Sequence, residues 1–100
     1  MDLYKIISIK QWEDSQKTAY LVLGPMDQEF IHLAEEGNYK RIGEKFFKGQ
    51  EVIVLLIDSS KLEGRLVKEA NPGGTNKYYH LYDGRIPIAA VKRTLHDKFS

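Results

Sequence analysis

The chain has 100 residues, of which 42% are apolar and 29% are charged, and this composition is typical of one soluble globular domain with a single core. Its net charge of +1 argues against a dedicated nucleic-acid binder, and the absence of cysteine excludes disulfides and Cys-ligated zinc. No apolar run approaches the roughly 20 residues of a membrane span. We therefore expect a single cytoplasmic domain over residues 1–100.

The first third of the chain predicts two strands and a short helix. Residues 3–9 are rich in β-branched side chains, which favours a strand. Ser8 and Gln11 have the spacing of a capping box and predict a short helix through Trp12 to about residue 16. Residues 20–23 fit a short strand or an extended loop, and residues 29–33 fit a strand.

The middle of the chain predicts the main helix and the central strand. Tyr39, Ile42 and Phe46 form one apolar stripe within residues 38–48, which is typical of a helix packed on a core. The longest apolar run is Glu51–Asp58. Because a half-exposed strand would alternate polar and apolar residues, we expect this segment to be a central strand covered on both faces.

The last third predicts strands at residues 65–70, 78–82 and 91–95. Asp83 and Gly84 are expected to turn the chain, residues 87–90 to form a short turn or helix, and residues 96–100 to be a loose tail. Several strands with two helices, and no regular strand–helix alternation, indicate an α+β domain.

Three side chains are candidates for chemistry: His32, Glu69 and His80, with Tyr82 beside the last. A neutral histidine carries one donor and one acceptor on its ring, so either histidine suits ligand binding or proton transfer. The alternative is that each histidine is a structural residue that is hydrogen-bonded to the backbone. No two of these residues have a short metal-ligand spacing, so we predict no metal site.

These residues also carry a family resemblance. Between residues 3 and 91 the chain resembles the small bacterial family called domain of unknown function 952. The resemblance is fairly specific in the combination of Phe30-Ile31-His32-Leu33 with His80-Leu81-Tyr82, and it extends to Trp12, Val54 to Asp58, Glu69, Gly73-Gly74 and Pro87 to Val91.

The resemblance implies a fold similar to that of ADP-ribosyltransferases, with bent, split β-sheets, one main helix and a short N-terminal helix. In those enzymes NAD lies in a cleft between the sheets, and a late glutamate often assists transfer. The resemblance therefore implies Glu69 and His32 as catalytic candidates, and His32, His80, Tyr82 and Tyr4 as ligand-binding candidates. Tyr4 stands near the position of the early-strand histidine of the transferases.

Two function hypotheses follow. The first is a protein that binds a small molecule or nucleotide, with NAD as a possible cofactor, in a cleft lined by His32, Glu69, His80 and Tyr82. It includes NAD-dependent ribosyl transfer by analogy of fold, in which a carboxylate such as Glu69 would stabilise positive charge on the ribose. The second is a non-catalytic protein-interaction or structural domain, which an exposed apolar patch would favour.

Overall fold

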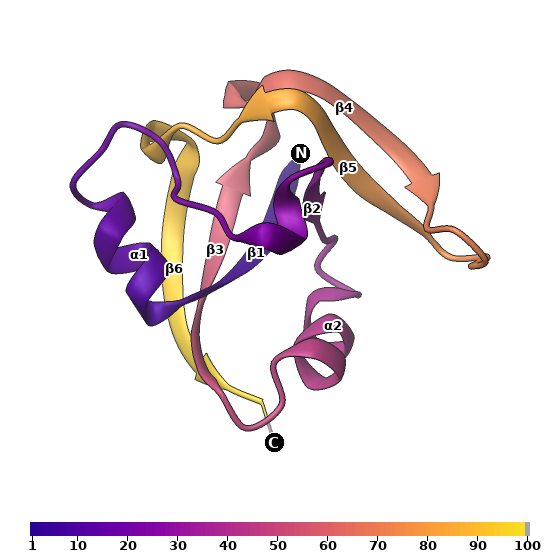
Figure 1. Ribbon diagram of the computed structural model, residues 1–100, viewed down its shortest axis with the longest axis horizontal. Coiled ribbons are helices and arrows are strands. Elements are labelled where there is room, and N and C mark those ends of the chain that lie inside the picture. The colour runs from indigo at the N-terminus through magenta and orange to yellow at the C-terminus, as the bar shows by residue number, and fades with distance from the viewer. Residues whose placement is uncertain (100) are drawn as a thin grey trace.

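The computed structural model describes residues 1–99 as an α+β domain with two three-stranded antiparallel sheets (Figure 1). The strand orders are β1-β3-β6 and β2-β5-β4. No helix among the described residues is long and apolar enough to cross a membrane. The strands are β1 (Asp2–Ser8), β2 (Ile31–Leu33), β3 (Glu51–Asp58), β4 (Glu63–Ala70), β5 (Lys77–Arg85) and β6 (Val91–Lys98), the α-helices are α1 (Ile9–Ser15) and α2 (Tyr39–Phe46), and the 3-10 turns are η1 (Pro25–Asp27), η2 (Ser59–Lys61) and η3 (Ile88–Ala90).

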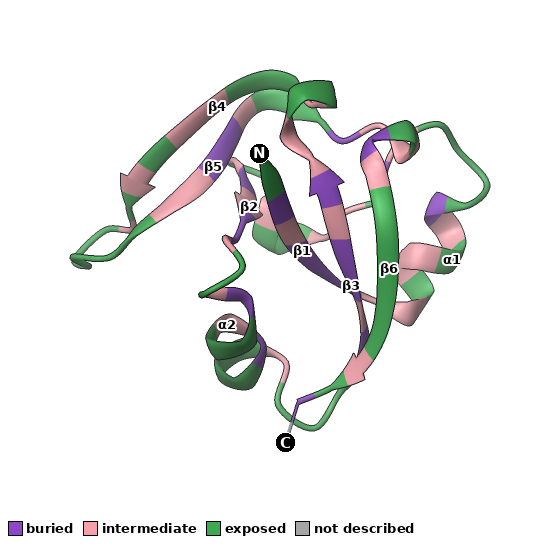
Figure 2. Cartoon of the chain, turned by 180° about the vertical axis from the view of Figure 1, so that it is seen from behind, coloured by how far each residue is buried: buried purple, intermediate pink, exposed green. Residues whose placement is uncertain are grey.

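Strand β3 is the central strand of its sheet, as its apolar run predicted. Leu55 and Ile57 belong to one buried cluster, whereas Val52 and Val54 belong to a second buried cluster that also includes Tyr39 of α2. Successive side chains of a strand point to opposite faces, so β3 is covered on both. Figure 2 shows buried segments along β1 and β3, whereas β6 is exposed over most of its length.

The two sheets meet where β1 approaches the segment that follows β2. The amide of Tyr4 donates to the carbonyl of Ala34 at 2.7 Å, and the amide of Ala34 donates back at 2.9 Å. Within residues 1–99 this is the one backbone bridge between the two sheets. The larger buried cluster spans both, because it includes Leu3 and Ile57 from one sheet and Leu81 from the other.

The local predictions near the N-terminus are confirmed. Ser8 caps α1, its hydroxyl accepts from the amide of Gln11 at 3.0 Å, and the Gln11 side chain accepts from the amide of Ser8 at 2.9 Å. Trp12 is partly buried and packs against the larger cluster. Farther along the chain, the 3-10 turn η3 falls within residues 87–90, as predicted.

Three expectations about the strands were wrong. Strand β2 is shorter than predicted, because residues 29 and 30 lie outside it. Asp83 and Gly84 do not end β5; they form an irregularity within it, where Asp83 has a positive φ of 50° and a Cβ on Gly84 would lie 1.9 Å from the Glu63 carbonyl oxygen. Residues 96–98 continue β6, and Phe99 is buried; Ser100 lies outside the described residues.

Candidate functional site

Of the five predicted site residues, all but Tyr4 share one face of the β2-β5-β4 sheet, and Tyr4 lies in β1 of the other sheet. His32 of β2 is paired directly with His80 of β5, and His80 is paired with Val67 of β4. Residues two apart on a strand lie on the same face, so Tyr82 and Glu69 join the two histidines there. The opposite face carries Ile31, Leu33 and Leu81, which belong to the larger buried cluster.

Glu69, His80 and Tyr82 form one hydrogen-bonded cluster. The His80 Nδ1 atom lies 2.7 Å from Glu69 Oε2, and the Tyr82 hydroxyl donates to the same oxygen. Hydrogen bonds from Tyr82 and His80 lower the pKa of Glu69, and the bond to Glu69 raises the pKa of Tyr82. Glu69 is therefore held as a carboxylate that orients the His80 ring.

Phe30 covers this cluster. Its ring stacks on His80 with a centroid separation of 4.0 Å, and it also packs against His32 at 4.8 Å and Tyr82 at 5.3 Å. His80 is only 1% exposed, and among the described residues its Nε2 atom has no hydrogen-bond partner. The ring of His80 is thus enclosed, although it lies 5.6 Å from that of His32.

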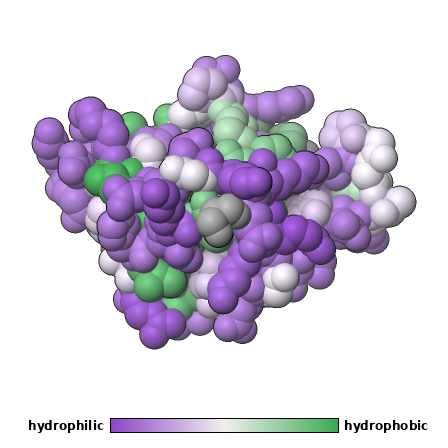
Figure 3. Space-filling view, turned by 90° about the horizontal axis from the view of Figure 1, so that it is seen from below, coloured by the Kyte–Doolittle hydropathy of each residue, from purple (hydrophilic) through white to green (hydrophobic). Residues whose placement is uncertain are grey.

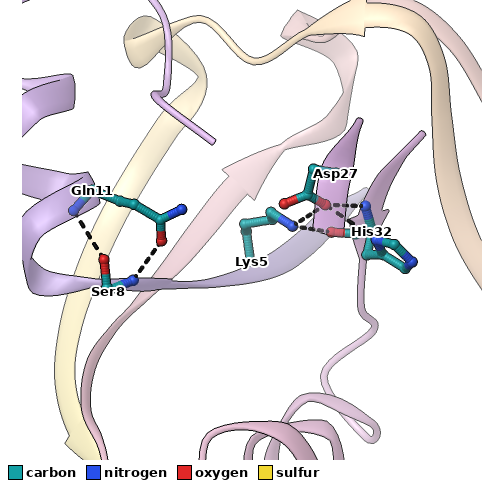
Figure 4. Close-up of polar contacts among 5 residues, drawn as sticks. All are labelled: Lys5, Ser8, Gln11, Asp27 and His32. Carbon is teal, nitrogen blue, oxygen red and sulfur yellow. Dashed lines mark hydrogen bonds and ion pairs between the residues drawn. The ribbon is translucent and has the colours of Figure 1, made fainter. Parts of the chain in front are cut away.

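His32 belongs to a second polar cluster with Lys5 and Asp27 (Figure 4). A single oxygen, Asp27 Oδ1, receives the Lys5 ammonium at 2.8 Å, the His32 amide at 2.9 Å and the His32 Nδ1 group at 3.1 Å. Lys5 also donates to the His32 carbonyl at 2.9 Å. The cluster therefore connects β1, η1 and β2 at the junction between the sheets.

Lys5 and Asp27 form a buried ion pair, since their side chains are only 6% and 8% exposed. Burial alone would raise the pKa of Asp27, but the hydrogen bonds from His32 and the charge of Lys5 outweigh it and lower that pKa to about 2. Burial lowers the pKa of Lys5, and Asp27 opposes this fall. With one donor ammonium 2.8 Å from a carboxylate of such low pKa, Asp27 is an anion at neutral pH.

A cavity of about 730 Å³ opens between β1, β2, α2, η1 and the loop that joins β4 to β5. His32 and Tyr4 line it, and the ring of Tyr4 stacks on Tyr39 with a centroid separation of 4.5 Å. Glu69, His80 and Tyr82 are not among the residues that line it. The polar and charged lining residues are Lys5, Gln11, Asp27, His32, Arg41, Lys45, Asn71 and Asn76, and aromatic rings are contributed by Tyr4, Phe30, Phe46, Phe47 and Tyr78.

The predicted site residues therefore fall into two groups. His32 and Tyr4 line the cavity, whereas Glu69, His80 and Tyr82 do not. Within residues 1–99 no three His, Asp or Glu side chains are placed to hold a metal ion.

A match to a family model described as "Protein of unknown function (DUF952)" covers residues 6–94. The chain belongs to the DUF952 family.

Solved structures of protein CC0527 from Caulobacter crescentus are similar to this DUF952 chain. Its X-ray crystal structure has a TM-score of 0.83 and 26% identity over 96% of this chain and 85% of that chain, and a double mutant gives the same values. The solution NMR structure of CC0527, with a TM-score of 0.78 and 24% identity over 99% of this chain and 86% of that chain, shows the shared fold alone. No curated protein matches this chain.

Sequence reasoning missed Lys5 and Asp27 in this DUF952 member. A signal for Lys5 was present. It lies two residues from Leu3 and two from Ile7 in β1, so it shares their face of the strand, and both of those residues belong to the larger cluster. A lysine at an inward position of a strand needs a buried partner. Nothing in the sequence points to Asp27 as that partner, since it lies 22 positions away in a 3-10 turn.

Proposed function

We propose that this DUF952 protein binds a small anionic molecule that carries an aromatic ring, with NAD or another nucleotide as the leading class, in the cavity beside His32. The cavity supports the proposal by its size, which lies within the range of about 300–1,000 Å³ usual for small-molecule sites. The similarity to the ADP-ribosyltransferase fold, which the family resemblance implies, stays a prediction and points to the same class of ligand.

The charge of the lining is the observation that carries the proposal. Lys5, Arg41 and Lys45 supply three positive charges, and Asp27 is the one carboxylate among the lining residues. The charges of Asp27 and Lys5 compensate each other in an ion pair, whereas Arg41 and Lys45 are exposed residues of α2. An anionic group would therefore find two cations at the wall that α2 provides.

Aromatic and apolar side chains surround these cations. Tyr4 of β1 and Tyr78 of β5 line the cavity together with Phe30, which precedes β2, and the large exposed side chains of Met26 and Phe46 lie at its walls. Aromatic faces stack with planar rings such as bases and nicotinamide. On the face seen in Figure 3, by contrast, hydrophilic residues separate the hydrophobic areas, and this pattern does not favour the protein-interaction alternative.

Binding without turnover is the form of the proposal that the geometry supports best. The glutamate expected to assist ribosyl transfer, Glu69, is bonded to His80 and Tyr82 and does not line the cavity. A carboxylate stabilises charge on a ribose only when it contacts the reacting atoms. We therefore expect ligand-dependent stabilisation of the fold and no release of nicotinamide from NAD.

Thermal unfolding with NAD, AMP and uncharged adenosine tests this proposal. At a free concentration tenfold above Kd, a ligand adds about 1.4 kcal/mol of stability, which raises Tm by roughly 6–11 °C in a domain of this size. We expect this rise with NAD and AMP and a smaller one with adenosine. No shift with either anionic nucleotide at millimolar concentration would remove the proposal.

A matched pair of variants locates the binding. Lys45→Gln removes a positive charge that lines the cavity, whereas Lys40→Gln removes one from an exposed position of the same helix that does not line it. Lys45→Gln should weaken AMP binding several-fold, as measured by calorimetry, and Lys40→Gln should leave Kd nearly unchanged. Equal effects would mean that general attraction by surface charge, and not the cavity, governs binding.

A further inference from the structure

We infer that Lys5, Asp27 and His32 form a hydrogen-bond-accepting site in the cavity wall, in which the Nε2 atom of His32 receives a hydrogen bond from a hydroxyl group of the ligand. Asp27 and Lys5 act as positioning residues. The inference rests on the proposed function, because it takes the cavity as the ligand site. It adds a chemical requirement to that ligand, which must carry a hydroxyl donor as well as its anionic group.

The first step is the tautomer of His32. An ionised carboxylate only accepts hydrogen bonds, so the contact of 3.1 Å between Asp27 Oδ1 and Nδ1 of His32 requires a proton on Nδ1. In the neutral ring the lone pair then lies on Nε2. The amide of His32 donates to the same oxygen, so the backbone and the ring of this residue are held by one acceptor.

The second step is the charge of Asp27. A protonated Asp27 carboxyl group could itself donate a hydrogen bond to Nδ1 of His32. The contact would then no longer require a proton on Nδ1. The ammonium group of Lys5, 2.8 Å from Oδ1 and almost fully buried, keeps the carboxylate ionised. Lys5 also binds the carbonyl of His32, which fixes the distance between β1 and β2 at this point.

The third step is access. The side chain of His32 is 44% exposed and lines the cavity, whereas His80 is enclosed beneath Phe30. A ligand in the cavity therefore meets the first ring and not the second. The hydroxyl donates to the lone pair of Nε2 and keeps its O–H bond, while the Asp27 carboxylate holds the ring proton on Nδ1.

The tautomer is tested directly by long-range ¹H–¹⁵N correlation of the imidazole rings in uniformly ¹⁵N-labelled protein at pH 8. We expect the Nδ1–H pattern for His32. In the double variant Lys5→Met/Asp27→Leu we expect the Nε2–H pattern, which free imidazoles favour in water. Replacing both members of a buried ion pair by apolar side chains of similar size leaves the fold stable in many proteins, whereas removing one member does not.

Reaction with diethylpyrocarbonate supplies an independent readout. The Nε2 lone pair attacks a carbonyl carbon, the ring loses its Nδ1 proton, and the displaced ethyl carbonate takes that proton and decomposes to ethanol and CO₂. His96, an exposed histidine on β6, is an internal reference in the same molecule. We expect His32 to react at least as fast as His96 in the natural chain, and several-fold more slowly than His96 in the double variant.

The outcomes separate this inference from the proposed function. Saturating AMP should protect His32 from the reagent and leave His96 unprotected. If AMP binds but His32 keeps its reactivity, the ligand does not contact this ring and the inference is wrong while the binding proposal stands. An Nε2–H pattern in the natural chain, or an unchanged reactivity ratio in a folded double variant, would also overturn it, whether or not a nucleotide binds.

Discussion

At the scale of single residues, two histidines that pair directly across neighbouring strands have opposite surroundings. His32 is held by Asp27 and faces a cavity, whereas His80 is held by Glu69 and is covered by Phe30. Each ring is oriented by a carboxylate at Nδ1, so the hydrogen bond alone does not distinguish a binding histidine from a structural one. Exposure of the ring makes that distinction, since the side chain of His32 is 44% exposed and that of His80 only 1%.

The Lys5–Asp27 pair predicts a loss of stability in acid. The pKa of Asp27 is about 2 in the folded chain, below its ordinary value of 3.8, so the unfolded state binds the proton first as pH falls. The stabilisation is complete above about pH 4 and is lost as pH falls from about 4 to about 2. Urea unfolding should show this loss in the natural chain, whereas Lys5→Met/Asp27→Leu should lack this part of it.

Two controls accompany the acid titration. Asp27→Asn alone leaves Lys5 buried without its counter-charge, and we expect it to cost about 3–5 kcal/mol at neutral pH. Asp83→Asn makes the same chemical change at an exposed position of β5 and should keep the acid-dependent loss of the natural chain. A double variant that loses as much stability between pH 4 and 2 as the natural chain would contradict the assignment to Asp27.

At the scale of elements, the sequence predicted those segments whose signal is local. The capping box of Ser8 and Gln11 depends on residues three apart, and β3 is a continuous apolar run because both its faces are covered. The end of β6 was missed, because its exposed polar residues look like a tail and only their pairing with β3 makes them a strand. Asp27 was missed for the same reason, since its partners are distant in sequence.

Helix α2 gives a prediction at this scale. Gly43 is buried, and a Cβ atom there would lie 2.2 Å from the ring of Phe99. In an exposed helix Gly→Ala is stabilising by about 1 kcal/mol, but here we expect Gly43→Ala to destabilise by about 1–3 kcal/mol through overpacking. Urea unfolding of Gly43→Ala in a Phe99→Ala background checks the cause, because without the ring the same change should be neutral or stabilising.

At the scale of the whole molecule, the question is whether two sheets that are joined by the Tyr4–Ala34 backbone bridge unfold together. The sheets share a buried cluster, in which Leu81 of β5 packs with Leu3 of β1 and Ile57 of β3. The cavity lies beside this junction, and the groups that form its wall come from both sheets. Ligand binding should therefore stabilise both sheets at once, provided that they form one cooperative unit.

Leu81→Ala tests that cooperativity. Leu81 is almost fully buried, so we expect the change to cost about 2–5 kcal/mol. If the shared cluster couples the sheets, amide hydrogen exchange should accelerate by the same factor in the slowest amides of β3 and of β5, although β3 itself is unaltered. Faster exchange in β5 alone would show that the β2-β5-β4 sheet opens independently, and the cavity wall would then separate from the β1-β3-β6 sheet without global unfolding.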